Sequence, residues 1–212
     1  MTRHSALASL LISWFVAAAA VTVMARNDFV STRKADGVTQ IDFAGRKVAA
    51  VLIVDDPSLR VPAEEALARE ISARGPIGVP AYQIIPQEEL TNTDAAKGWF
   101  ERRGIAGLVV LRPVKTETEK VYSAAVWASG YYGYAWDYWG YGWANVTPIG
   151  KGRDQRTITV ETMLYDLTKG TAMWAAVTRT TDPKDVQSYV KGLAKDVVKR
   201  LESDGLVRTL PR

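Results

Sequence analysis

The sequence predicts a single α/β domain, in which a βαβαβ core continues into an antiparallel hairpin and a C-terminal helix to give one mixed sheet. Three observations predict this fold. Residues 47–55 and 108–111 are short, continuous apolar runs, as in strands that are covered on both faces. The chain between them carries apolar residues at helical spacing. Beyond residue 157, apolar residues recur at every second position on both sides of a turn, which indicates a hairpin.

The first strand and helix follow a polar segment, residues 26–45. Residues 47–55 are rich in β-branched side chains, and Pro57 and Pro62 then interrupt the run. The helix that follows ends at Gly75. Its apolar face consists of Ala63, Ala66, Leu67 and Ile71.

The second half of the core is predicted from shorter signals. Residues 82–85 are expected to form a strand, and Thr93 or Asp94 can cap a helix that ends at Gly104. Residues 108–111 then form the third strand. Because strands and helices alternate, the connections are expected to be right-handed crossovers.

The closing elements are the hairpin and the last helix. Residues 166–170 form the turn between the two alternating runs. Asp182 is expected to cap the helix, with Pro183 at its first position, and residues 204–205 end it. The α/β domain therefore spans residues 46–207.

The beginning of the chain resembles an export signal. Arg3 supplies a positive charge, the following residues up to Met24 are uncharged and mostly apolar, and small or tolerated residues precede a cleavage site after Ala25. Residues 1–25 are thus expected to be a signal peptide, with an uncleaved inner-membrane anchor as the alternative. The protein is expected in the periplasm or outside the cell. With no cysteine in the chain, a lipid anchor on cysteine is excluded.

Composition excludes several chemistries. The one histidine, His4, lies in the expected signal peptide, and there is no cysteine. The mature chain therefore has no imidazole base, thiol nucleophile or common zinc or haem ligand, so no cofactor and no metal are expected. The net charge of +4 is modest, and an exported protein rarely meets nucleic acid, so no nucleic-acid partner is expected.

Carboxylates offer the remaining route to catalysis. Asp55 and Asp56 follow the first strand, where ligands of open α/β sheets bind, although a helix-entry turn is the preferred interpretation of this pair. Glu88 and Glu89 are interpreted as a solvated loop pair. No spacing places two of these carboxyls across a substrate, so the protein is not expected to be an enzyme. The alternative is a carboxylate-dependent glycan hydrolase of the cell wall that uses these four residues.

The pattern of residues 47–54, 82–86 and 104–111, with the hairpin over 159–174, resembles a family of bacterial envelope proteins. Their α/β domain is similar to the amino-terminal domain of TolB, and they include the curli-assembly lipoprotein and the lipoprotein activator of penicillin-binding proteins. The resemblance covers about residues 46–205 and implies a non-enzymatic part of an envelope assembly. This chain departs from many such proteins because it lacks the lipid-bearing cysteine.

An aromatic, glycine-rich insertion, residues 127–143, is the most unusual feature of the sequence. It holds four Trp and five Tyr. They could fold back over the sheet as a small core, form an exposed platform that binds a protein or a sugar, or touch the membrane surface. The predicted contact residues are Trp127, Tyr131, Tyr132, Tyr134, Trp136, Tyr138, Trp139, Tyr141 and Trp143.

The hypothesis is therefore a non-catalytic exported envelope protein that has a binding or assembly role. Its contact surface would be the aromatic-rich loop. Peptidoglycan or another envelope protein is the expected partner.

Overall fold

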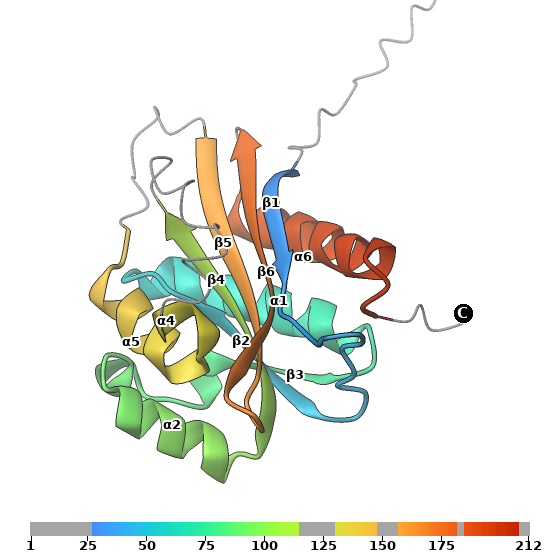
Figure 1. Ribbon diagram of the computed structural model, residues 1–212. Coiled ribbons are helices and arrows are strands. Elements are labelled where there is room, and N and C mark those ends of the chain that lie inside the picture. Colours follow the sequence, from blue (N-terminus) through green and yellow to red (C-terminus); the bar gives the residue numbers. More distant parts are fainter. Residues whose placement is uncertain (1–26, 115–129, 148–156, 182–184, 208–212) are drawn as a thin grey trace, which may run out of the picture.

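A six-stranded mixed sheet forms the centre of the domain, with helices on both faces (Figure 1). The computed structural model describes residues 27–114, 130–147, 157–181 and 185–207. The strands are β1 (Asn27–Lys34), β2 (Lys47–Leu52), β3 (Ile77–Pro80), β4 (Ile105–Val114), β5 (Thr157–Asp166) and β6 (Thr171–Thr181). The helices are α1 (Pro57–Ser72), α2 (Thr93–Arg102), α4 (Gly130–Gly133), α5 (Ala135–Ala144) and α6 (Val186–Ser203), with short 3₁₀ turns η1 (Ala81–Gln83) and η2 (Gln87–Glu89).

The strand order is β1-β6-β5-β4-β2-β3. Strands β3, β2 and β4 run parallel to one another, whereas β4, β5, β6 and β1 pair antiparallel. The α/β fold and the mixed sheet predicted from the sequence are confirmed, and so is the β5–β6 hairpin.

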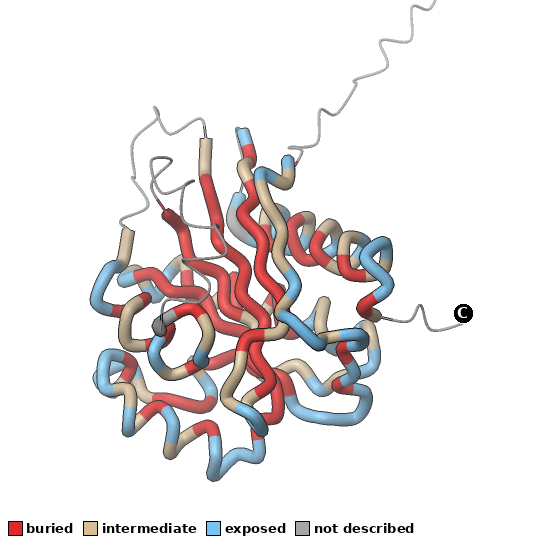
Figure 2. The backbone as a smooth tube through the Cα atoms, in the orientation of Figure 1, coloured by how far each residue is buried: buried red, intermediate tan, exposed pale blue. Residues whose placement is uncertain are grey.

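Two cores lie on opposite faces of the sheet. One packs α1 and α6 against side chains such as Leu52 and Trp174, and the other packs α2, α4 and α5 against side chains such as Ile53 and Leu108. Successive residues of a strand point to opposite faces of the sheet. The nearly continuous apolar runs of β2 and β4 therefore supply apolar side chains to both cores. Figure 2 shows this as a continuous buried centre with exposed helix surfaces.

Helix ends follow ordinary capping chemistry. The Asp56 carboxylate accepts a hydrogen bond from the Ser58 backbone at 2.9 Å and starts α1, as the helix-entry interpretation predicts. Helix α2 is capped by Asn92, one residue before the expected Thr93, and α6 is capped by Asp185. Residue 182, the expected cap of α6, lies outside the described residues.

Three predictions need correction. Residues 82–85 do not form a strand: β3 is Ile77–Pro80, because Pro80 cannot continue the ladder and the chain turns into η1. The polar segment 26–45 contains β1, an edge strand whose polar side chains concealed it. The aromatic stretch is two helices rather than a loop over residues 130–133 and 135–144.

Strand β3 closes one edge of the sheet. Its Ile77 N–H donates to the Arg46 carbonyl at 2.8 Å, and its Gly78 N–H donates to the Ser72 hydroxyl of α1 at 2.9 Å. At Gly78 a Cβ atom would lie 2.1 Å from the Ala68 carbonyl oxygen, so only glycine permits this approach of helix and strand.

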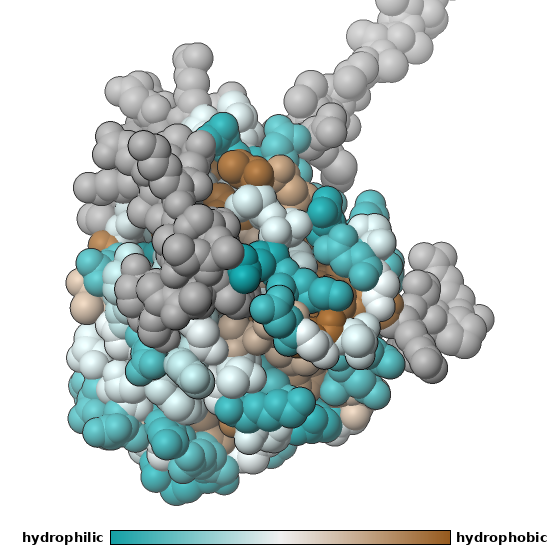
Figure 3. All heavy atoms as spheres, viewed as in Figure 1, coloured by the Kyte–Doolittle hydropathy of each residue, from teal (hydrophilic) through white to brown (hydrophobic). Residues whose placement is uncertain are grey.

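Among the helices of the described residues, none combines the length and the apolar character that crossing a bilayer requires. The expected signal peptide, residues 1–25, lies outside this part of the chain. In the view of Figure 3, hydrophobic areas are small and separated by hydrophilic side chains. The large exposed apolar side chains of the described residues are Val30, Ile77 and Tyr134.

Candidate functional site

The aromatic segment folds onto the sheet as an amphipathic helix. The buried residues of α5 are spaced at i, i+3, i+4, i+7 and i+8, which places them on one helical face. They are Ala135, Tyr138, Trp139, Gly142 and Trp143. This face lies against the core that also contains α2.

The predicted contact residues therefore divide into groups. Four are buried, Trp136 and Tyr141 are half-buried, and Tyr134 is 57% exposed. Residue 127 lies outside the described residues, as does the side chain of residue 131. The four buried side chains are Tyr132, Tyr138, Trp139 and Trp143. These four side chains do not face solvent, so the prediction that they belong to an exposed contact surface is corrected.

Ring packing is the physical reason for this burial. The Trp139 ring makes an edge-to-face contact with Phe100 of α2, with 5.4 Å between centroids, and its indole N–H donates to the Leu90 carbonyl at 2.8 Å. Trp136 makes a similar edge contact with Phe100 at 5.7 Å. Such pairs stabilise by about 1 kcal/mol beyond the area they bury. The first interpretation of the stretch, a small aromatic core, describes these rings.

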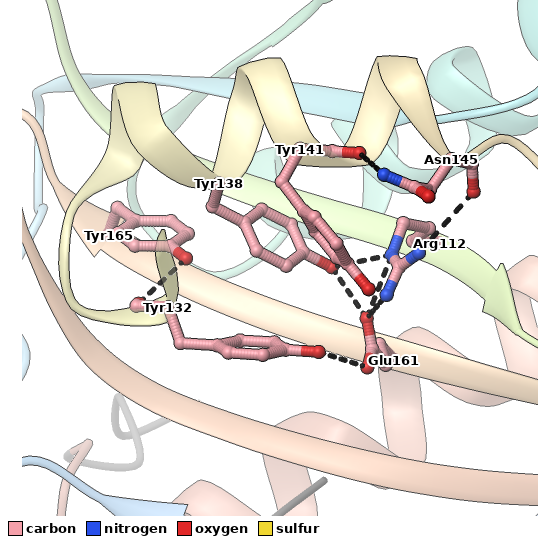
Figure 4. A network of polar contacts seen from close by, with 7 residues as sticks. All are labelled: Arg112, Tyr132, Tyr138, Tyr141, Asn145, Glu161 and Tyr165. Carbon is pink, nitrogen blue, oxygen red and sulfur yellow. Dashed lines mark hydrogen bonds and ion pairs between the residues drawn. The ribbon is translucent and has the colours of Figure 1, made fainter. Parts of the chain in front are cut away.

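A buried ion pair lies beneath the two aromatic helices (Figure 4). Arg112 of β4 and Glu161 of β5 are direct partners in the strand register. The guanidinium donates from Nε and Nη2 to Oε2 of Glu161, at 2.8 and 2.6 Å. Arg112 is 3% exposed and Glu161 is 0% exposed, so this pair is sealed from solvent.

Tyrosine hydroxyls complete the coordination of Glu161. Tyr132 donates to Oε1 at 3.0 Å, and Tyr138 donates to Oε2 at 2.9 Å. Tyr165 donates to the Tyr132 carbonyl at 3.0 Å, which fixes the end of α4. Each hydroxyl therefore acts as a donor in a network that leaves no carboxylate oxygen without a partner.

Electrostatics keeps these groups in their donor and acceptor forms. Burial, followed by the negative charge of Glu161, raises the pKa of Tyr132, Tyr138 and Tyr165, so the phenols remain protonated. Burial alone would lower the pKa of Arg112, but Tyr138 and Glu161 outweigh it and raise that pKa. The guanidinium also lies 4.9 Å from the centre of the Tyr141 ring, a cation–π distance.

This network can position helices, but in this conformation no substrate can reach it. Its members come from β4, β5, α4 and α5, so it ties the aromatic helices to the sheet. Sequence reasoning missed Arg112 and Glu161. The signal was Arg112, the single charge in the otherwise apolar run of β4, because a buried charge calls for a partner of opposite charge.

The network adjoins the place where α/β sheets bind ligands. The chain leaves β2 through α1 on one face and leaves β3 through α2 on the other, so the parallel connections reverse beside β2. Here α5 occupies that point. A Cβ on Gly142 would lie 2.5 Å from Cδ1 of Ile53, and the Asn145 carbonyl accepts from Arg112 at 3.5 Å. The aromatic helix thus fills the crevice.

Of the four candidate carboxylates, two take part in structural hydrogen bonds and two are exposed. Asp56 caps α1 and also accepts from the Ser58 hydroxyl at 2.6 Å. Glu89 accepts the indole N–H of Trp99, while Asp55 and Glu88 are exposed. Among the described residues, no group of three or more Asp, Glu, His or Cys side chains is placed to hold a metal ion.

Comparison with known proteins gives only distant similarities. No family model matches the chain, and no curated protein matches it. It is similar to PelC from Paraburkholderia phytofirmans, solved as a dodecamer, at 15% identity and a TM-score of 0.41 over 84% of this chain and 99% of that chain. A single-substitution PelC dodecamer gives 16% identity and a TM-score of 0.44 over 81% and 98%. Likeness at this level carries no argument about function. The resemblance to the TolB amino-terminal domain stays a prediction.

Proposed function

We propose that this protein is a non-catalytic, exported component of the bacterial envelope that binds a partner through the exposed edge of its aromatic helices. The observation that carries the proposal is the position of α5. It fills the crevice in which an α/β enzyme would hold its substrate. What this region offers to other molecules is its outer surface.

Rings on that outer surface give the proposed contact its chemistry. Tyr134 is largely exposed, and Trp136 and Tyr141 are half-exposed. The buried network beneath them ties the two helices to the sheet, so binding does not have to order their backbone. Aromatic side chains of this kind pack well on protein surfaces and on sugar rings. Another envelope protein or peptidoglycan is therefore the proposed partner.

Two other hypotheses have less support. A membrane-touching tip must accommodate Asp137, which is exposed on α5 among the rings. A glycan hydrolase would need a pair of free carboxylates, but Asp56 is used as a helix cap and Glu89 accepts an indole N–H, which leaves the exposed Asp55 and Glu88. Release of soluble sugars from cell-wall material, lost in Asp56→Asn, would favour the hydrolase instead.

The test compares a double variant, Tyr134→Ala with Trp136→Ala, with a matched control, Ile77→Ala. Ile77 is 49% exposed on β3, away from the aromatic helices. Circular dichroism first establishes that each variant is folded. The two readouts are crosslinking to envelope proteins and co-sedimentation with purified peptidoglycan. We expect the double variant to lose whichever of them the wild type shows, and Ile77→Ala to keep it. A folded double variant that binds like the wild type would overturn the proposal.

A further inference from the structure

β1 is the longer of the two edge strands of the sheet. It is eight residues long and pairs with β6 alone among the described strands, with α6 beside it on one face (Figure 1). The Ala35 N–H donates to the Met173 carbonyl next to β1 at 3.0 Å, so the backbone groups of Thr32 and Lys34 point away from β6. No described residue accepts a hydrogen bond from these two N–H groups.

A bulge shifts this pattern in the first half of the strand. The register with β6 skips one residue between Phe29 and Ser31, so Val30 is the extra residue. The shift turns the backbone groups of Asn27 and Phe29 outward, and it leaves the Val30 side chain 40% exposed. An edge with a bulge and several charged residues is a poor template for a regular partner strand.

The outward-pointing residues share one face of the sheet, the face that carries α6. Asn27 donates to the Asp196 carboxylate of α6 at 2.8 Å. The Thr32 hydroxyl accepts from Arg200 of α6 at 3.1 Å. Lys34 lies two residues beyond Thr32, so its side chain is on the same face.

We propose that β1 pairs antiparallel with β1 of a second copy of this chain, about a two-fold axis, so that two sheets become continuous. In the register that fits, Phe29 lies opposite Thr32 and Asn27 lies opposite Lys34. Both pairings join residues whose backbone groups point outward and whose side chains share a face, as an antiparallel ladder requires. A second copy also brings the same bulge to the same place. Such a dimer needs no contact with the partner of the aromatic helices.

Charges on both faces of the sheet match in this register. On the α6 face, Lys34 of one copy lies opposite Asn27 of the other and therefore beside Asp196. The Asp196 carboxylate has no cationic partner among the described residues, and the exposed Lys34 has no acidic one there. On the other face, Asp28 lies opposite Arg33. The two-fold axis makes each pair occur twice, and opposite charges at facing positions stabilise a strand pair.

A groove beside β1 gives the lysine of the second copy room to reach α6. This open groove of about 330 Å³ is lined in part by Asn27 and Asp196. Its own cations are Lys199 and Arg200. Neither makes an ion pair with Asp196 in the described chain, and Arg200 pairs with Asp204 at 3.1 Å instead. Lys34 of the second copy would supply the missing cation.

Light scattering coupled to size-exclusion chromatography tests the dimer on the purified protein, over a concentration series. We expect a monomer–dimer equilibrium in the wild type. Lys34→Glu places a second carboxylate beside Asp196 and should raise the Kd for dimerisation by at least about tenfold. Adding Asp196→Lys exchanges the two charges and should restore the dimer. Circular dichroism establishes that each variant is folded.

The matched control is Lys97→Glu, which makes the same charge change at an exposed position of α2 on the other face of the sheet. Its Kd should equal that of the wild type. A wild type that stays monomeric up to millimolar concentration would overturn the proposal. So would a folded Lys34→Glu variant that dimerises like the wild type, or a folded charge-exchange variant that stays as weak as Lys34→Glu.

Disulfide trapping tests the register without changing Lys34 or Asp196. The chain has no cysteine, so an introduced thiol is unique. In the proposed register, residues 28 and 33 form a non-hydrogen-bonded pair with Cα atoms about 4.5 Å apart, which a disulfide can span. An equimolar mixture of Asp28→Cys and Arg33→Cys should therefore give a mixed disulfide under mild oxidation, identified by mass spectrometry.

A mixture of Asp28→Cys and Lys34→Cys is the control for the register. Residue 34 is shifted by one position and lies on the opposite face, so this mixture should give little mixed disulfide. Equal trapping in the two mixtures, or no trapping in the first, would overturn the proposed pairing.

Discussion

Removing the positive half of the buried ion pair should destabilise the whole domain. In Arg112→Met, Glu161 would keep the donors Tyr132 and Tyr138 but lose both guanidinium bonds, at 2.8 and 2.6 Å. The carboxyl group would then lie without its cation in a place with 0% exposure. Breaking a buried pair from one side costs about 3–5 kcal/mol. This is a large share of the 5–15 kcal/mol that typically stabilises a domain.

The double variant separates the pair from its surroundings. Because Arg112→Met with Glu161→Leu removes both charges, its loss should be smaller than the sum of the two single losses. We expect a coupling energy of about 2 kcal/mol or more between the two sites. The matched control is Arg69→Met. Arg69 pairs with Glu65 at 3.7 Å on an exposed helix surface, and such pairs contribute about 0–1 kcal/mol.

Urea unfolding followed by tryptophan fluorescence measures these differences. Trp139 and Trp143 lie on α5 above the network, so the release of this helix contributes to the change in fluorescence. The reasoning fails if Arg112→Met loses less than about 1 kcal/mol. It also fails if the losses of the two single variants add up to that of the double variant, because the two charges would then not act as a unit.

Two further predictions concern stability. Burial raises the pKa of Glu64 from 4.5 to about 7, so the folded state binds this proton more tightly than the unfolded state does. The free energy of unfolding should therefore fall by about 2.5 kcal/mol between about pH 5 and pH 8, as measured by urea titrations across that range. Glu64→Gln should abolish that pH dependence, and an unchanged dependence would contradict a raised pKa of Glu64. Gly142→Ala should lose about 1–3 kcal/mol, because its Cβ would lie 2.5 Å from Cδ1 of Ile53. Gly140→Ala meets only the Thr93 hydroxyl at 3.0 Å and gains helix propensity, so it should be nearly neutral. Equal losses in the two glycine variants would argue against close packing of α5.

Most of the fold could be predicted from the sequence because the central strands are apolar on both faces. Residues 47–55 and 108–111 stand out for that reason and locate β2 and β4. Strand β1 was missed because an edge strand can be polar and still pair through its backbone. The expected strand at residues 82–85 was wrong. Ile84 and Ile85 are buried, but they follow the turn η1 and do not pair with a strand.

The site was harder to foresee. Glycine-rich composition favoured a loop over residues 127–143, yet Ala135, Tyr138, Trp139, Gly142 and Trp143 already had helical spacing in the sequence. Composition outweighed periodicity in that interpretation. The pairing of Arg112 with Glu161 depends on β4 and β5 being neighbours in register, which spacing along the chain does not specify.

The edge strand β3 has a consequence for how copies of this protein can associate. The backbone polar groups of successive strand residues point alternately to the two edges of the strand. The Ile77 N–H donates toward β2, so the backbone groups of Gly78 and Pro80 point away from the sheet. The amide of Gly78 is already engaged by Ser72, and proline has no amide hydrogen to offer. An incoming strand would find no free amide donor on this edge of β3, which disfavours edge-to-edge pairing with another copy.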